Sequence, residues 1–435
     1  VEQASCLFGE NGATYQFIKY PMKILMFSST FPYPPSRGGT QVRTFNLLKY
    51  LNSRHHVILG TVRSPDVTDA QIEQLRQQVA ELAVFDNLGT VSPRITHKIQ
   101  RLGHFLWSGT PPNVLSSYSP VMQHWADELV AAGKCDVVTC EHSVNEIYVR
   151  PEWRQKVLTV ANIHSSVWGT CRQMLATGTS ENPLRDRLNL PLLARYEKRY
   201  CSKFSRIVTT TETDRQQLLE LLSPADRRGG APVPAHPVPP FDVIPNGVDL
   251  AEFPYRSIDP GGHTLIFAGA MNNLPNIDAV RFLSLEVLPI VQQRYPDTTL
   301  TVVGASPVAE VLALGKLPGI QVVGRVQRVA EYLHQVAVCV VPMRIGFGIK
   351  NKTLEAMAAG TPVVASDRGL EGLAIGGGGQ PRRALRANGV QEYVEAITSL
   401  FENQQLRQEL SRSARSLVES EYTWDIIGQR YDRVL

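Results

Sequence analysis

Short apolar runs alternate with amphipathic stretches along most of this chain. Residues 23–27 form an apolar run that ends in a polar loop, apolar positions at helical spacing begin at Val42, and residues 56–60 form a second apolar run. Strand, helix and strand in this order predict a βαβ unit, which builds a parallel sheet. The alternation continues with strands expected at 136–139, 157–161 and 206–209, and helices at 119–133 and 189–203.

A second alternating series follows a stretch rich in proline and glycine. Strands are expected at 264–268, 299–303, 320–323, 336–342 and 362–365, and helices at 278–295 and 352–359. Two separate series predict an α/β protein with two doubly wound, Rossmann-like domains and a hinge near residues 247–258.

The pattern also sets the expected domain limits. We expect an N-terminal domain over 22–247, in which residues 223–240 form a Pro-rich loop, and a C-terminal domain over 248–416. Residues 1–21 lack the basic start and apolar core of a signal peptide. We expect a disordered leader or upstream extension there, with an ordered N-terminal arm as the alternative.

Composition narrows the function. The net charge of +4 is too small a bias to indicate a nucleic-acid partner. The six cysteines have neither CxxC spacing nor histidines at zinc spacing, so we expect no metal site. In a chain of 435 residues they suit free thiols in a reducing compartment, which favours a cytoplasmic location. No apolar run reaches the 18 residues of a membrane-spanning helix.

The most informative stretch runs from residue 342 to residue 366, where an expected strand, a glycine loop and a helix follow one another. Gly346 and Gly348 let the backbone pass close to a ligand, and a helix N-terminus with Lys350 and Lys352 suits a diphosphate. Glu355 lies three residues after Lys352 and can share its helix face, where a carboxylate can accept two hydrogen bonds from a ribose diol. A surface glutamate is the alternative.

The run LEAMAAG-TPVVAS resembles family 4 of the retaining glycosyltransferases, and the wider pattern PxRxGxGxxxKxLEAMAxGxPVVA is similar to a subgroup of that family. The resemblance implies the GT-B fold: an N-terminal acceptor domain and a C-terminal donor domain face each other across a cleft. It also implies that the last helix, in 417–435, returns to the N-terminal domain.

The implied activity is transfer of a hexose-type sugar, with retention, from a nucleotide diphosphate sugar. UDP- or GDP-sugars are the expected donors, a hydroxyl of a glycan, lipid-linked or small-molecule acceptor receives the sugar, and no cofactor is needed. A nucleotide-sugar 2-epimerase of the same fold and a non-catalytic sugar-nucleotide binder are the alternatives.

The resemblance also assigns roles to individual residues. The donor diphosphate is expected at Gly38, Gly39, Arg344, Gly346, Phe347, Gly348, Lys350 and Lys352. Glu355 is expected to bind the ribose, Gly324 and Val326 the base. Sugar or phosphate contacts are expected at Gly269, Met271, Asn272 and Asn276. The chain departs from the family pattern at two places. Phe347 replaces a family glutamate near the donor sugar. Residues 269–276 lack two cationic residues of the family, and we expect Arg344, Lys350 and Lys352 to supply that charge instead.

Polar residues at strand ends in the first half complete the expected site. The resemblance places His164 near the C6 hydroxyl of the donor sugar, as the catalytic candidate. Glu141 and His142 are candidate acceptor contacts. Glu197 and Glu212 match family positions, but capping and helix packing are the favoured interpretation.

Residues 94–107 alternate basic and apolar positions as an amphipathic helix does. A core helix with a solvated face is one interpretation. The other is contact with an anionic membrane or a lipid-linked acceptor, which would make the protein peripheral to the inner membrane face.

Overall fold

The computed structural model describes residues 21–35, 38–86, 105, 109–180, 182–223, 238–346, 348–376 and 379–435. Four features expected from the sequence lie wholly or largely outside these residues. They are the leader at 1–21, the basic helix at 94–107, the Pro-rich loop at 223–240, and Phe347.

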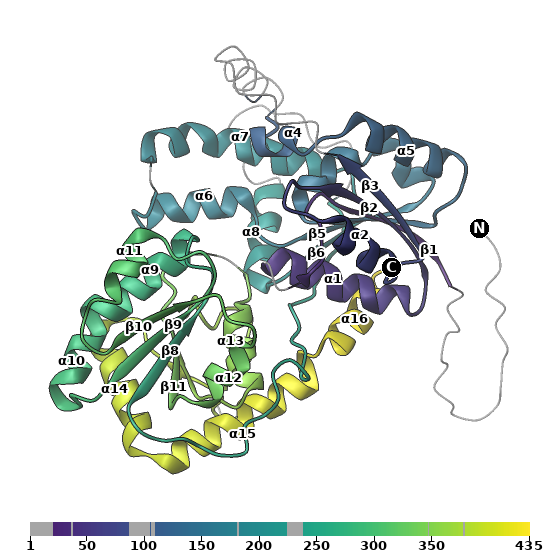
Figure 1. The fold of residues 1–435 in the computed structure, drawn as a ribbon. Coiled ribbons are helices and arrows are strands. Elements are labelled where there is room, and N and C mark those ends of the chain that lie inside the picture. The colour runs from purple at the N-terminus through teal and green to yellow at the C-terminus, as the bar shows by residue number, and fades with distance from the viewer. Residues whose placement is uncertain are drawn as a thin grey trace.

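The N-terminal half forms one parallel seven-stranded sheet with helices on both faces (Figure 1). Its strand order is β3-β2-β1-β4-β5-β6-β7, with bounds β1 Lys23–Ser28, β2 His56–Arg63, β3 Glu81–Asp86, β4 Val137–Glu141, β5 Leu158–Ile163, β6 Arg206–Thr209 and β7 Phe241–Val243. Its α-helices are α1 Gly39–Asn52, α2 Asp69–Arg76, α4 Pro112–Ser116, α5 Pro120–Ala131, α6 Val167–Ala176, α7 Pro183–Cys201 and α8 Glu212–Leu222. Residues 24–27 of β1 are fully buried, because a parallel strand covered on both faces has no solvent side.

The C-terminal half forms a second parallel sheet, of six strands, which is likewise covered by helices. Its order is β10-β9-β8-β11-β12-β13, with bounds β8 Thr264–Ala268, β9 Thr299–Val303, β10 Ile320–Gly324, β11 Val338–Val341, β12 Val363–Ala365 and β13 Leu385–Arg386. Its helices are α9 Leu274–Phe282, α10 Leu288–Arg294, α11 Ala309–Leu314, α12 Val329–His334, α13 Asn351–Ala358, α14 Val390–Glu402 and α15 Gln404–Glu421. The predicted α/β architecture with two doubly wound domains is confirmed.

Two helices differ from their predictions at proline positions. The helix expected over 278–295 begins at Leu274, and its two α-helical parts are joined by a π-helical turn at Leu283–Val287. Pro289, at the start of the second part, has no N–H to donate within the preceding turn. The helix expected at 189–203 begins earlier, at Pro183, because the side chain of Asn182 accepts a hydrogen bond from the Arg185 N–H and caps it.

The last helix, α16 (Trp424–Asp432), leaves the C-terminal domain and packs against α1. Where the chain returns, Val248 pairs with Thr423 in a parallel bridge. The Tyr431 hydroxyl then donates a 2.9 Å hydrogen bond to Glu141 inside the N-terminal domain. The last helix thus returns to the N-terminal domain, as the resemblance implied, and the chain crosses between the domains twice at one place.

Candidate functional site

The glycine loop after β11 runs against the N-terminal domain. Gly346 and Gly348 have φ values of +95° and +73°, in the region that favours glycine. A Cβ atom on Gly348 would come within 3.0 Å of the Thr210 hydroxyl and 3.2 Å of the His164 carbonyl oxygen. Glycine is therefore needed at this position both for the turn and for the close approach of the two domains.

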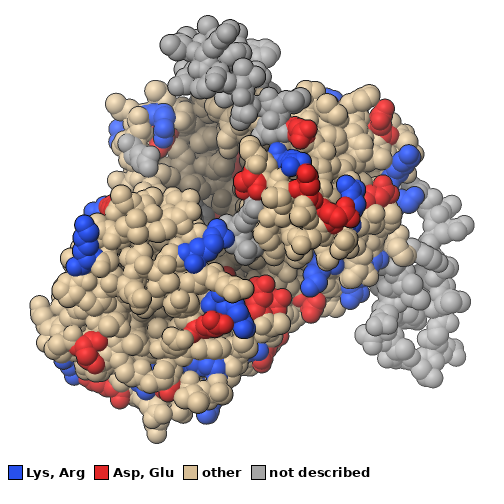
Figure 2. Space-filling model, viewed as in Figure 1, with Lys and Arg blue, Asp and Glu red and all other residues tan. Residues whose placement is uncertain are grey.

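Two helix N-termini meet beside this loop. Helix α13 begins at Asn351 and α1 begins at Gly39, and in neither does a side chain cap the first turn. A Cβ atom on Gly39 would lie 3.9 Å from the side-chain nitrogen Nδ2 of Asn351, so the first residues of the two helices lie close together across the domain boundary. Uncapped backbone N–H groups with a helix dipole behind them favour an anionic ligand. Figure 2 shows the surface hollowed between the two domains, with Lys and Arg side chains beside the hollow.

Lys352 places a buried ammonium group at the same end of α13. Its Nζ atom donates a 2.5 Å hydrogen bond to the Asn276 side chain and lies 4.5 Å from the centre of the Phe267 ring. A Cβ atom on Gly269 would come within 2.9 Å of this nitrogen. Burial, assisted by the charge of Lys350, lowers the pKa of Lys352 to about 7. The structure thus brings three expected donor-site residues together.

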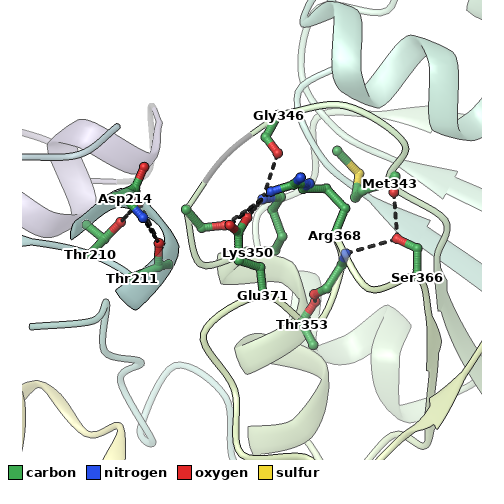
Figure 3. A network of polar contacts seen from close by, with 12 residues as sticks. Thr210, Thr211, Asp214, Met343, Gly346, Lys350, Thr353, Ser366, Arg368 and Glu371 are labelled. Carbon is green, nitrogen blue, oxygen red and sulfur yellow. Dashed lines mark hydrogen bonds and ion pairs between the residues drawn. The ribbon is translucent and has the colours of Figure 1, made fainter. Parts of the chain in front are cut away.

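Lys350 has a different position from Lys352. Its Nζ atom donates to the Gly348 carbonyl at 2.5 Å and lies 3.6 Å from Glu371, which also pairs with Arg368 at 2.9 Å (Figure 3). Burial is the main cause that lowers the pKa of Lys350 to about 8, against the opposing effect of Glu371. This ammonium group holds the glycine loop in shape.

Glu355 is half-buried on α13, one turn after Lys352. Burial raises the pKa of its carboxyl to about 7, although Lys352 acts to lower it. The carboxylate forms no hydrogen bond or ion pair with another described residue. A half-buried carboxylate without such a partner retains its full capacity to accept hydrogen bonds from a ligand.

The remaining residues expected to contact the donor differ in how accessible they are to a ligand. Arg344 is held by both oxygens of Asp278 and lies over the Phe282 ring, with its charge already paired. The Met271 side chain is fully buried in the core and is not available to a ligand, which corrects the expectation for it. Asn272 is exposed, and Gly324 and Val326 are partly exposed after β10.

Two histidines from neighbouring strand ends lie together in the N-terminal domain. The rings of His142 and His164 are 5.0 Å apart, edge to face. His142 has a φ of +84°, which costs energy for a residue with a side chain, and such strain concentrates at functional sites. Burial lowers the pKa of His142 to about 4, and burial is also the main cause that lowers the pKa of His164 well below its usual value. The Nε2 atom of His164 is buried and has no hydrogen-bond partner among the described residues.

Glu141 does not face the cleft, which corrects its assignment as an acceptor contact. It is fully buried and accepts hydrogen bonds from Asn162 at 2.7 Å and Tyr431 at 2.9 Å. Glu197 is also fully buried, and its oxygens accept from Ser166 and from the N–H of Val167 at the start of α6. The capping interpretation therefore holds for Glu197.

Sequence reasoning missed Arg43 and a pocket at the domain boundary. Arg43 is fully buried, and its guanidinium donates hydrogen bonds to the side chains of Asn162 and Asn246. The pocket, about 460 Å³ in volume, lies on the Arg344 side of the glycine loop, and Gln173 and Thr213 of the N-terminal domain line it with Ser366 and Tyr393 of the other. The Tyr393 hydroxyl is buried without a hydrogen-bond partner. The lining residues come from segments far apart in the sequence, so no local pattern predicts this pocket.

Comparisons with known proteins define the class. The model "Glycosyltransferase Family 4" matches residues 37–228, and "Glycosyl transferases group 1" matches residues 262–403. With one matching model in each Rossmann-like domain, the chain has the domain pair of a GT-B glycosyltransferase.

Individual relatives agree with this class. The chain is 27% identical to a glycogen synthase of Mycobacterium tuberculosis over 43% of this chain and 46% of that protein. It is 31% identical to a phosphatidyl-myo-inositol mannosyltransferase of Mycolicibacterium smegmatis over 44% of this chain and 50% of that protein. The matches thus span about half the length of these curated relatives.

Solved structures extend the likeness of fold to nearly the whole chain. Anabaena HepE in complex with UDP-glucose has a TM-score of 0.61 at 14% identity and covers 95% of this chain and 99% of its own. TarM has a TM-score of 0.61 at 12% identity and covers 95% and 98%. Among the described helices, none combines the length and the apolar character that crossing a bilayer requires.

Proposed function

We propose that this protein transfers a hexose-type sugar, with retention, from a nucleotide diphosphate sugar to a hydroxyl of a glycan, lipid-linked or small-molecule acceptor. The observation that carries the proposal is the meeting of two uncapped helix N-termini, α1 and α13, beside Lys352 and a carboxylate without a partner, Glu355. This arrangement suits the diphosphate and the ribose of one ligand.

The donor lies across the domain boundary in this proposal. Its diphosphate binds the N–H groups at Gly39 and Asn351 and the ammonium of Lys352, its ribose diol binds Glu355, and its base lies at Gly324 and Val326. UDP is the preferred nucleotide because HepE and TarM, which share the fold, are described in complexes with UDP.

The reaction breaks the bond from the anomeric carbon to the diphosphate oxygen and forms a bond to the acceptor oxygen on the same face. The acceptor proton passes to the leaving diphosphate oxygen, so no protein carboxylate pair is required. The protein positions the reactants and stabilises charge on the departing diphosphate through the helix ends and Lys352. His164 contacts the donor sugar as a neutral hydrogen-bonding group, in keeping with its lowered pKa.

The acceptor enters from the pocket on the Arg344 side of the glycine loop. Both domains line this pocket, and its volume of about 460 Å³ is in the range of ligand sites. Tyr393 lines this pocket, and a sugar hydroxyl that reached its buried hydroxyl group would give that group a hydrogen-bond partner. The five described cysteines are all buried free thiols, which agrees with a cytoplasmic location.

A thermal-shift screen of UDP- and GDP-sugars tests the donor site. A selective donor at about 100 times its dissociation constant stabilises the fold by about 2.7 kcal/mol. NMR of the product's anomeric proton then tests retention. Conversion of the donor alone to its epimer would instead identify a 2-epimerase, and binding without transfer to any acceptor would identify a non-catalytic binder.

A further inference from the structure

Helix α7 carries an exposed face on which two leucines lie among basic residues. Counted from Leu184, the other residues of the face lie three or four positions beyond an earlier member, and all of them are exposed: Leu184, Arg187, Leu188, Pro191, Arg195 and Lys198. Steps of this size place side chains on one side of a helix. Leu184 and Leu188 are 73% and 74% exposed, which places them among the most exposed large apolar side chains described in this protein.

The charge of this face has one sign. Arg187, Arg195 and Lys198 form no ion pair with any described residue. The two acidic residues of the helix lie on its other side: Asp186 is 8% exposed and Glu197 is fully buried. Because both carboxylates are turned inward, the α7 face offers only positive charge to a partner.

The position of the helix leaves the cleft open. Figure 1 shows α7 on the outside of the N-terminal domain, with α6 between it and the C-terminal domain. A large surface that contacts α7 would therefore not cover the donor site.

We propose that the α7 face binds the surface of an anionic lipid bilayer. Leu184 and Leu188 insert among the headgroups and upper acyl chains, while Arg187, Arg195 and Lys198 contact lipid phosphates. Exposed leucines within a purely cationic helix face match the two requirements of interfacial binding, an apolar surface to insert and a charge opposite to that of the membrane. This contact does not depend on the proposed transferase activity.

Vesicle flotation with the full chain tests the proposal. The protein should float with vesicles of phosphatidylcholine mixed with phosphatidylglycerol, much less with phosphatidylcholine alone, and added salt should weaken binding. Each basic residue near such a surface contributes about fivefold to the partition coefficient, so Arg187→Gln/Arg195→Gln/Lys198→Gln should lower it by about 100-fold. Leu184→Ser/Leu188→Ser should lower it by about tenfold or more, even at low salt.

A matched control carries the same loss of charge elsewhere. Lys134, Lys316 and Arg382 are exposed and form no ion pair with a described residue. Lys134→Gln/Lys316→Gln/Arg382→Gln should bind vesicles nearly as well as the unaltered protein. The melting temperature and the thermal shift with donor should be the same in all variants.

Three results would overturn the proposal. They are failure of the unaltered protein to float with anionic vesicles, flotation of the α7 variants at the unaltered level, and an equal loss in the control. If the unaltered protein does not float, an acidic protein becomes the partner that fits the charge of this face. If the control loses as much binding, the effect depends on net charge and not on the α7 face.

Discussion

Two clusters of charged groups, one in each domain, use their hydrogen-bonding capacity differently. In the N-terminal domain, Arg43 donates to the Asn162 side chain, the Ile244 and Pro245 carbonyls, and the Asn246 side chain, at 2.8 to 3.2 Å. In the C-terminal domain, the Lys352 ammonium has one oxygen acceptor among the described residues, and the Glu355 carboxylate has no partner there.

The difference separates a structural role from a binding role. A buried charge whose hydrogen bonds are all made by protein groups fixes the fold and has nothing left for a ligand. A buried charge with unused hydrogen-bonding capacity lowers the stability of the fold. Its presence is explained if a ligand makes the missing hydrogen bonds. Substitution at Arg43 should therefore lower the stability of the fold, whereas substitution at Lys352 or Glu355 should weaken donor binding.

The largest effect should come from Arg43→Met. The change leaves several buried acceptors without a donor, so the free energy of unfolding should fall by about 3–5 kcal/mol. Urea unfolding measures it. Arg63→Met, which removes a surface ion pair to Asp69, should change it by less than about 1 kcal/mol. Equal effects of the two changes would show that the buried cluster has no special structural role.

Glu355→Ala should act on the ligand instead. Loss of two charge-assisted hydrogen bonds, with partial rescue by water, should weaken nucleotide-sugar binding by about two orders of magnitude in calorimetry. Stability should not fall, because the raised pKa of Glu355 shows that burial disfavours its charge. Glu212→Ala, an exposed glutamate paired with Arg215, is the control and should leave affinity unchanged. A stability loss with intact affinity would remove Glu355 from the donor site.

Lys352→Met should weaken donor binding by about tenfold, the loss expected for one charge-assisted contact. The apolar replacement matches the buried surroundings, so the fold should tolerate it. Lys316→Met, at an exposed position, is the matched control. If Lys352→Met binds the donor as tightly as the control does, then Lys352 does not contact the diphosphate.

The pH dependence of binding should follow Lys352 once Glu355 no longer titrates. In the unaltered protein the pKa of Lys352 is about 7 and Glu355 raises it, so in the Glu355→Gln background this pKa should be lower and Lys352 should lose its charge as pH rises through it. The diphosphate binds the protonated form better, so donor affinity should fall severalfold over the same pH range. Adding Lys352→Met should flatten this profile; a slope that persists would assign the titration to another group.

The smallest effect is expected in the domain-boundary pocket. Tyr393→Phe removes the orphaned hydroxyl and should raise the KM for acceptor by about threefold, the loss of one neutral hydrogen bond. The affinity for donor should be unchanged in calorimetry. A change in donor affinity with unchanged KM for acceptor would show that this pocket belongs to the donor.

The sequence predicted the C-terminal half of the site better than the N-terminal half. The glycine loop, Lys352 and Glu355 lie within a few residues of each other, so local spacing alone puts them at one helix end. Arg344 belongs to the same stretch, but its partner Asp278 lies 66 residues away, and no local pattern shows that its charge is paired.

The buried cluster around Arg43 could not be predicted for the same reason. Asn246, a partner of Arg43, lies 203 residues away from it in the sequence. Tyr431, which donates a hydrogen bond to Glu141, lies 290 residues from Glu141. In a helical pattern an arginine is normally taken as exposed. The fold class was predictable because alternation of strands and helices is local, whereas the pairing of distant charges is set by tertiary packing.

The double crossing between the domains has a mechanical consequence. Asn246 bonds Arg43 on one side and Asn351, the first residue of α13, on the other, and Gly247 lies directly against the Trp424 ring. Because both segments that connect the domains lie together at this hinge, the domains can rotate about a single axis. The start of α13 is bonded to Asn246 at this hinge, while α6, the helix that carries the pocket residue Gln173, lies away from it (Figure 1). Opening the molecule would therefore widen the acceptor entrance most and disturb the phosphate contacts least.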